Sequence, residues 1–224
     1  MKVQDNALHK IPLILMQGSW RSSIKDVQRY VKKGINIFDN SNLEINNKHC
    51  KIEEGNADSD LNNFLLHMER SAHENVYNLF LNSSSTLVYS VFEHALFSII
   101  QTIEKITNKK IHIVRHDKNM KLKPIIDSYI NALKRQYKIN WSKLNDSWAK
   151  INDFRLIRNK ITHNGAVLNG RDNSEFNEIS KMELGVSRRG NIIMLSDCYL
   201  LDIINTMIYF FEELCLELKE HVLL

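Results

Sequence analysis

Residues that break regular backbone structure are scarce in this chain. Its 224 residues include 7 glycines and 2 prolines. This scarcity excludes a collagen-like repeat and disfavours a β-sandwich, which needs a turn every ~8–12 residues. It favours long helices instead. Hydrophobic residues make up 43% of the chain and charged residues 25%, which is typical of a folded globular protein rather than a disordered one.

Cysteines and long apolar runs are also few. The three cysteines, Cys50, Cys198 and Cys215, are odd in number and form no C-x-x-C pair, so neither a disulfide framework nor a zinc module is indicated. The longest apolar run near the N-terminus covers residues 11–16, which is shorter than the ~7–15 residues of a signal sequence. We find no run that approaches the ~18 residues of a membrane span. We therefore expect a soluble, cytoplasmic protein with no membrane partner.

The signatures of common cofactor and metal sites are missing. The chain has no P-loop, G-x-G-x-x-G, G-x-S-x-G or H-E-x-x-H string. The main signals of nucleotide-binding folds, of serine hydrolases of that type and of zinc proteases are therefore absent. His112 and His116 are four residues apart, but the β-branched residues around them favour a strand or loop, and no third ligand is near in sequence. We expect neither a metal site nor a cofactor.

Hydrophobic periodicity predicts a mostly α-helical fold. Residues 58–110 contain no glycine or proline, which permits one long helix or two helices broken at the serines 83–85. Further helices are expected over residues 121–138, 142–163 and 197–221. Residues 179–186 and 191–195 have the pattern of a short β-hairpin before the last helix.

Residues 1–57 have a less regular pattern. Residues 20–33 could form an amphipathic helix, whereas residues 35–38 and 43–45 alternate like short strands. We therefore expect two parts. One is an N-terminal extension of mixed structure over residues 1–57, whose role the sequence does not indicate. The other is a helical bundle over residues 58–224.

Positive charge is concentrated in one block of the chain. Residues 101–160 contain 15 Lys or Arg against 5 Asp or Glu, although the net charge of the whole chain is only +4. Folded onto one face, such a block would concentrate a polyanion such as RNA. Lys150, Arg155 and Lys160 are then the expected RNA contacts. The alternative is a set of solvated helix faces.

The helix expected over residues 142–163 carries the candidate site. On a helical wheel Arg158 falls inside the apolar stripe that contains Ile151 and Phe154. An arginine in that place needs a partner or a cleft, because removing water from a guanidinium costs several kcal/mol. His163 stands in the last turn, where the helix dipole favours the protonated imidazole, and Asn164-Gly165 is a typical helix end.

The string FRLIRNKITHNG at residues 154–165 resembles the R-x4-6-H motif of the HEPN superfamily. The likeness includes the asparagine directly after the arginine and the place of the histidine at the helix end, and it covers residues 58–224. The resemblance implies a small helical bundle that acts as a metal-independent endoribonuclease. It also implies a homodimer in which the motifs of the two protomers face each other. Arg158 and His163 would be the catalytic pair, and Asn159 their polar companion.

One departure from the family concerns regulation. HEPN proteins that are paired with nucleotidyltransferase antitoxins tend to carry a tyrosine two residues after the histidine. This chain has Gly165 at that position. Regulation through modification of that tyrosine is therefore not expected.

Glu93 is a further candidate for the site. It is the only acidic residue between Glu74 and Glu104, within a nearly apolar segment. A carboxylate there needs a partner, for which Arg158 is the natural candidate, and some HEPN nucleases are similar in placing an acidic residue on the first bundle helix. The alternative is a glutamate at the solvent-facing rim of the helix, beside His94 and Gln101.

The chemistry of RNA cleavage fits these residue types. RNA carries its own nucleophile, the 2′-OH, so cleavage needs a base, an acid and a cation for the charge that develops on phosphorus. His163 suits the proton transfers, and the planar fork of Arg158 suits the phosphate oxygens.

We therefore expect an endoribonuclease that acts on RNA as a homodimer. From the resemblance, it would be a toxin or an anti-phage (abortive-infection) effector held in check by an inhibitory antitoxin or a sensor protein. The alternative is a non-catalytic HEPN-like module for dimerisation or RNA binding.

Overall fold

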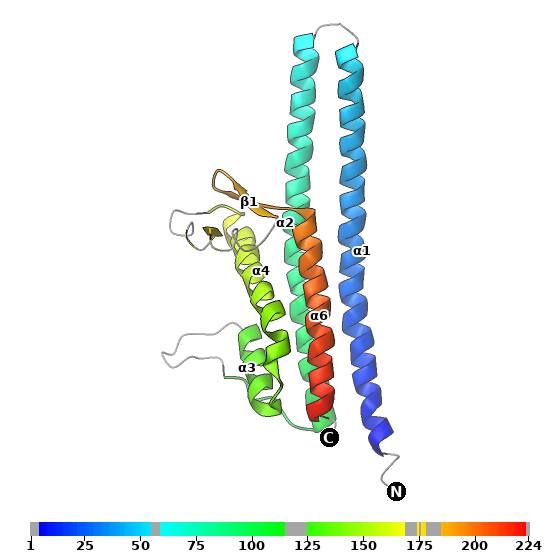
Figure 1. Ribbon diagram of the computed structural model, residues 1–224, viewed down its shortest axis with the longest axis vertical. Coiled ribbons are helices and arrows are strands. Elements are labelled where there is room, and N and C mark those ends of the chain that lie inside the picture. The colour runs from blue at the N-terminus through cyan, green and yellow to red at the C-terminus, as the bar shows by residue number, and fades with distance from the viewer. Residues whose placement is uncertain are drawn as a thin grey trace. The chain divides into compact units, whose positions relative to one another are not determined.

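The computed structural model describes residues 5–54, 59–114, 125–168, 174, 176–177 and 185–222, and these residues are mostly helical (Figure 1). The predicted α-helical bundle with a short hairpin before its last helix is confirmed. The elements in chain order are α1 (Asp5–Glu54), α2 (Ser59–Thr107), α3 (Ile125–Tyr137), the 3₁₀-helix η1 (Trp141–Leu144), α4 (Asn145–Asn164), β1 (Val186–Arg189), β2 (Ile192–Leu195) and α6 (Asp197–Val222).

The N-terminal region differs from the expected mixed structure. Helix α1 is continuous over Asp5–Glu54, and the two short strands expected at residues 35–38 and 43–45 are absent. The reason lies in the burial pattern, because Ile24, Val31 and Ile35 are buried at helical spacing while Ile37 is 60% exposed. The apparent alternation at residues 35–38 was therefore a short stretch of a helical repeat.

Helix α2 runs without a break through the serine cluster at residues 83–85. Two of these hydroxyls bond backward within the helix, Ser83 Oγ to the carbonyl of Phe80 at 2.9 Å and Ser85 Oγ to that of Asn82 at 2.7 Å. Such bonds let serine hydroxyls be satisfied without leaving the helix. Of the two alternatives that the sequence permits, the single long helix is the one observed.

The hairpin is antiparallel, with Val186 opposite Leu195 and Arg189 opposite Ile192. Gly190 lies in its turn with a positive φ of +61°, a conformation that favours glycine. Observed strand β1 begins at Val186, and the first part of the expected strand, residues 179–184, lies outside the described residues. The sequence offers Ser196 or Asp197 as the cap of the last helix, and the structure shows Ser196, whose Oγ accepts the backbone N–H of Tyr199 at 3.1 Å at the start of α6.

The chain divides into two compact units, each of which draws on several helices. The first unit comprises Met1–Asp26, Val88–Arg155 and Ile203–Leu224, and the second comprises Val27–Leu87 and Leu156–Asp202. Both units therefore include part of α1. The expected boundary at residue 57 falls in a stretch, residues 55–58, outside the described residues.

An aromatic cluster forms the core of the first unit. Phe92 of α2 lies 5.1 Å from Phe211 of α6 between ring centroids, and Trp148 of α4 lies 5.7 Å from Phe210. Stacked and tilted aromatic pairs of this kind add to the burial energy of the rings. The cluster fixes the first half of α4 against α2 and α6.

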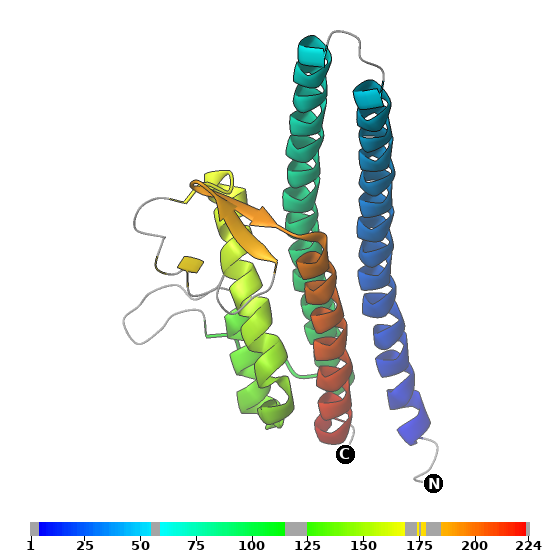
Figure 2. The same cartoon turned by 45° about the horizontal axis from the view of Figure 1, so that its top comes forward.

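The second unit is built on the antiparallel halves of α1 and α2, which lie side by side in both Figures 1 and 2. His73 of α2 contacts the carbonyl of Phe38 at 3.1 Å, and Arg70 donates to Asn46 Oδ1 at 2.8 Å. Gly34 makes the close approach possible, because a Cβ there would collide with the ring of Phe80. The end of α4, the hairpin and the start of α6 complete this unit.

One helix is long and apolar enough to cross a membrane by its length and composition alone, over Asp60–Thr107. Of its most apolar window, 44% is buried inside the molecule. The core helix of a soluble protein meets the same criterion. The expectation that no run approaches a membrane span therefore does not hold for α2, while the cytoplasmic location stays a prediction.

Candidate functional site

The candidate site lies at the end of α4, which stops where the sequence predicts. The backbone N–H of Ala166 donates to the carbonyl of Lys160 at 3.3 Å, and that of Val167 to the carbonyl of Asn164 at 3.0 Å. Gly165 and Ala166 both have positive φ, +59° and +66°. The helix therefore ends in a defined turn directly after His163.

Arg158 is half-buried, and its Nη1 donates a hydrogen bond to Oδ1 of Asn159 at 3.1 Å. The apolar residues on either side of it, Ile157 and Ile161, are buried. The arginine thus emerges from an apolar stripe, as the sequence predicts, and the amide next to it holds its guanidinium. Asn159 therefore contacts the arginine, and its role as a companion in the site stays a prediction.

His163 is exposed and stands directly before the turn that ends α4. Five residues separate it from Arg158 on the same helix, which corresponds to a rotation of about 140° and a rise of about 7.5 Å. The two side chains therefore leave α4 in different directions. Within one protomer, the side chains of His163 and Arg158 therefore point to different regions around the helix.

Helix α2 contacts the last turn of α4 beside the histidine. Thr86 Oγ1 and Thr162 Oγ1 are 3.3 Å apart, and Thr86 also donates to the carbonyl of Asn82 at 3.4 Å. Thr86 is a site neighbour that the sequence analysis missed. No sequence pattern singled it out, because its role depends on the packing of two distant helices.

The hairpin is joined to the turn that follows the motif. Val167 forms a bridge with Ile192 of β2, and the backbone N–H of Ile193 donates to the carbonyl of Ala166 at 2.9 Å. Two exposed arginines, Arg188 and Arg189, lie on β1 next to this strand. Two adjacent cations near a turn are a sequence signal for a phosphate contact. In the structure Arg189 forms an ion pair with Glu74 of α2 at 3.0 Å.

The predicted site residues divide between the two units. Arg158, Asn159, Lys160 and His163 lie together in the second unit, on the last turns of α4. Lys150 and Arg155 of α4 and Glu93 of α2 belong to the first unit, and Glu93 is half-buried there. The pairing of Glu93 with Arg158 stays a prediction.

Arg155 forms an ion pair within the first unit. Its Nη1 donates to Oδ1 of Asp127 on α3 at 2.9 Å, and the two side chains are only 17% and 26% exposed. The pair joins α3 to α4 within the first unit. Arg155 can therefore stabilise the packing of α3 against α4, in addition to its predicted contact with RNA.

Other cations of the basic block also have internal partners. Lys143 pairs with the buried carboxylate of Glu217 at 3.2 Å, and Lys134 lies 3.8 Å above the ring of Trp141. Burial lowers the pKa of Lys134. Part of the charge in residues 101–160 is thus used inside the first unit, which reduces the field available to a polyanion.

Metal ligands do not gather in the described part of the chain. No three His, Cys, Asp or Glu side chains within it lie close enough to hold a metal ion. His112 is exposed, while His116 lies outside the described residues.

Comparisons with known proteins identify no relative. No protein-family model, no curated protein and no solved structure matches the chain.

Proposed function

We propose that the chain is a metal-independent endoribonuclease of the HEPN type, with Arg158 and His163 as its catalytic residues. One observation carries the proposal. An exposed histidine stands at the fixed end of α4, five residues after a half-buried arginine whose guanidinium is held by the adjacent Asn159. This arrangement supports a site in which the arginine is positioned in advance and the histidine is accessible to a large substrate.

The reaction follows from the chemistry of these groups. One imidazole takes the proton of the RNA 2′-OH, and the 2′-oxygen attacks the adjacent phosphorus. The bond from phosphorus to the 5′-oxygen breaks, and that oxygen receives a proton from an imidazolium. The guanidinium of Arg158 binds the nonbridging oxygens, on which negative charge accumulates. The products are a 2′,3′-cyclic phosphate and a 5′-OH.

The geometry of α4 favours two protomers in one site. Because Arg158 and His163 leave the helix about 140° apart, a single motif does not direct both groups to the same phosphate along one face. Two motifs that face each other would supply two histidines, one as base and one as acid. The proposed enzyme is therefore a homodimer, and its inhibitory antitoxin or sensor protein is proposed from the resemblance.

The test compares Arg158 with Lys160, which lies two residues later in the same unit and has the same charge. We expect Arg158→Ala to lower the single-turnover cleavage rate at least about 100-fold, because it removes a group that stabilises charge in the transition state. Arg158→Lys should rescue the rate poorly, since a point charge lacks the bidentate fork. Lys160→Ala should weaken RNA binding several-fold and leave the rate at saturation nearly unchanged. Equal losses at both positions would contradict a catalytic role for Arg158.

A second candidate function has an observation in its favour. The bond from Arg158 to Asn159 and the contact between Thr162 and Thr86 would also suit a motif whose role is to hold the end of α4 in a non-catalytic RNA-binding or dimerisation module. On that reading Arg158→Ala lowers the melting temperature and the parent protein does not cleave RNA. On the enzymatic reading cleavage is lost while the melting temperature is kept.

A further inference from the structure

Helix α2 exposes an apolar stripe in the second unit. The stripe consists of six residues at spacings of three or four, namely Leu61, Leu65, Met68, Ala72, Val76 and Leu79. Its five large side chains are 53% to 67% exposed. The spacing is that of a helix face that packs against another helix.

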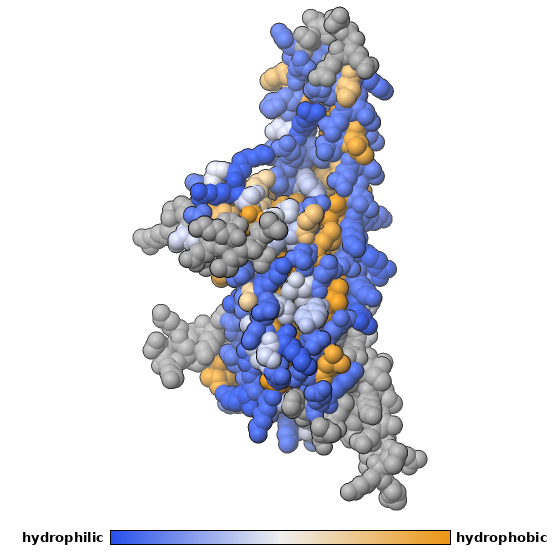
Figure 3. Space-filling model, viewed as in Figure 1, coloured by the Kyte–Doolittle hydropathy of each residue, from blue (hydrophilic) through white to orange (hydrophobic). Residues whose placement is uncertain are grey.

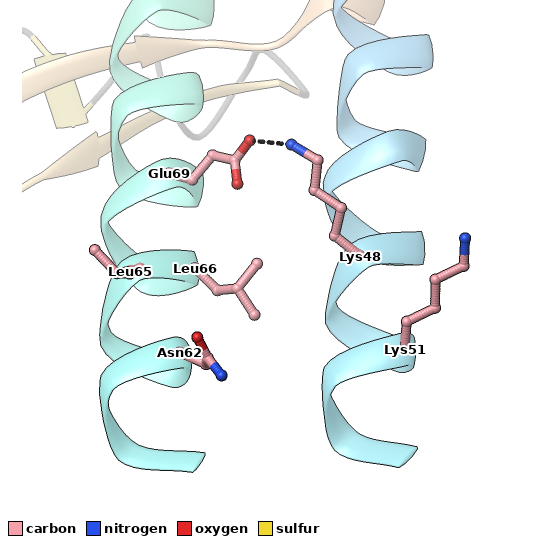
Figure 4. Close-up of a pocket in the computed structure, with 6 residues that line it drawn as sticks. All are labelled: Lys48, Lys51, Asn62, Leu65, Leu66 and Glu69. Carbon is pink, nitrogen blue, oxygen red and sulfur yellow. Dashed lines mark hydrogen bonds and ion pairs between the residues drawn. The ribbon is translucent and has the colours of Figure 1, made fainter. Parts of the chain in front are cut away.

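Most of the stripe lies outside the face that α2 packs against α1. Leu66 is buried, and Figure 4 shows its side chain reaching toward α1, whereas the side chain of Leu65 points away from α1. Lys48 of α1 and Glu69 of α2 form an ion pair of 2.7 Å beside a pocket between the two helices, and both Leu65 and Leu66 line this pocket. The stripe therefore meets the α1–α2 contact at Leu65, and its other members lie outside the residues that line the pocket.

The centre of the stripe carries no charged residue. On a wheel of 100° per residue, the charged side chains between residues 60 and 79 lie outside the sector that the stripe occupies. Asn75 borders the stripe on one side and Glu69, about 20° from Val76, borders it on the other. Charges at its centre would keep such a face in water. Their absence fits a face that is covered by another apolar surface.

The area of the stripe is that of a protein interface. Together with the neighbouring Phe64, which is 59% exposed, the large side chains present on the order of 600 Å² of apolar surface, close to the ~800 Å² that each partner contributes to a standard interface. The surface of the α1–α2 region in Figure 3 shows apolar patches among hydrophilic residues. A patch of this size is at the upper end of those on monomeric proteins, whose largest exposed apolar patch measures ~300–600 Å² and often serves a function.

The order of residues in the stripe identifies its occupant. In a two-fold symmetric pair of antiparallel helices centred near residue 70, Leu61 faces Leu79, Leu65 faces Val76, and Met68 faces Ala72. The longest side chain is thereby matched with the smallest. A parallel pair would instead place Met68 against Met68 and Ala72 against Ala72, which packs unevenly. We propose that the stripe binds the same stripe of a second copy of this chain, with the two α2 helices antiparallel.

This interface is distinct from the one that the proposed nuclease requires. Thr86, which contacts the end of α4, lies 16 residues from the centre of the stripe, or about 24 Å along the helix. An antiparallel pair would therefore hold the two motifs apart rather than opposite each other. The inference does not depend on the nuclease assignment, and its test needs no RNA.

The test replaces two facing residues of the stripe with like charges. Leu65→Glu with Val76→Glu would bury four glutamates in the interface, so we expect this variant to sediment with half the mass of the wild type at roughly 10 μM, with unchanged helical circular dichroism. Ile37→Glu with Leu43→Glu is the matched control, because both residues are about 60% exposed on α1 of the same unit and lie outside the stripe. This control should keep the wild-type mass.

Cysteine cross-linking tests the orientation. In a background that carries Cys50→Ser and Cys198→Ser, a mixture of Leu61→Cys and Leu79→Cys chains should form a 61–79 disulfide on mild oxidation, and neither chain should form one with itself. Cross-links of 61 to 61 would overturn the antiparallel arrangement. A monomeric wild type, a charged variant with the wild-type mass, or a monomer that floats with phosphatidylglycerol vesicles would overturn the interface itself.

Discussion

Arg155 and Arg158 lie within one turn of α4, yet they contact different kinds of partner. Arg155 forms a half-buried ion pair with Asp127 of α3, and Arg158 bonds the adjacent Asn159. The sequence placed both in the same basic block and gave Arg155 an RNA contact. An ion pair between residues 28 positions apart leaves no signal in a single sequence, because it depends on how α3 packs against α4.

The ion pair between Arg155 and Asp127 should contribute to the stability of the fold. We expect Arg155→Ala to reduce the free energy of unfolding by about 1 kcal/mol, somewhat more than an exposed pair would, because the partner carboxylate is left partly buried. Asp127→Asn should have a similar effect, and the double variant should cost less than the two single variants together. Urea denaturation of the four proteins measures this coupling. Strict additivity would show that the pair contributes nothing.

The free energy of unfolding should depend on pH through ionisation of the Tyr77 hydroxyl. Burial raises the pKa of its hydroxyl to about 12, and the negative charges of Asp197 and Asp39 act in the same direction. An unfolded tyrosine titrates near 10. The stabilisation from this group is therefore complete below pH about 10 and is lost as the pH rises toward 12.

Tyr77→Phe, which cannot ionise, should lose less stability than the wild type over this interval. Chemical denaturation at several pH values compares the two proteins, and phenolate absorbance follows the titration. The same decline in both proteins would show that other groups account for it.

At the scale of the elements, the predictions succeeded where the signals were local and strong. The end of α4 at Asn164-Gly165 and the cap of α6 at Ser196 are set by residues within a few positions. The hairpin was expected with residues 187–190 between its strands, but residues 187–189 belong to β1 and the turn follows at Gly190. The N-terminal region was predicted incorrectly because four residues with alternating polarity also fit a helix. Its buried spacing is clear only over the whole length of α1.

The turn after His163 can be tested with a matched pair of glycines. Gly165 and Gly190 have nearly the same φ, +59° and +61°, and a Cβ at either position would meet no atom within 4 Å. Alanine at either site should therefore destabilise the protein by about 1 kcal/mol through backbone strain alone.

Only the Gly165→Ala change lies in the turn that follows His163. We expect it to lower RNA cleavage beyond its effect on stability, and Gly190→Ala to leave the rate per folded molecule unchanged. Denaturation curves and cleavage rates of the two variants provide the comparison. Equal rates in both would mean that the turn does not position His163.

At the scale of the whole molecule, the sequence predicted the helical class and the place of the motif but not the division into units. That division cuts across α1, α2, α4 and α6, so no shift in composition or linker marks it. The sequence also did not predict the exposed apolar stripe of α2. The pattern of apolar residues along a helix does not tell which side of the helix is buried in the folded protein. Both features depend on contacts between distant segments.

Salt dependence tests which cations of the basic block bind phosphates. If the cations near the motif bind phosphates, RNA affinity should fall with salt, and the log–log slope should decrease by about 0.7 for each contact removed from a single strand. Lys160→Ala should therefore reduce the slope by about this amount. Arg155→Ala should reduce it less, because that charge is paired. Filter binding across a salt series measures both, and a larger reduction in Arg155→Ala would contradict the assignment.

The most direct test of the central claim is whether the purified protein cleaves a total RNA pool in the presence of EDTA. The proposed mechanism uses arginine and histidine for the charge stabilisation and proton transfer that a metal would otherwise provide. We predict cleavage by the wild type that leaves 2′,3′-cyclic phosphate ends and is lost in His163→Ala at an unchanged melting temperature. Strict dependence on a divalent metal, or equal cleavage by His163→Ala, would contradict the account.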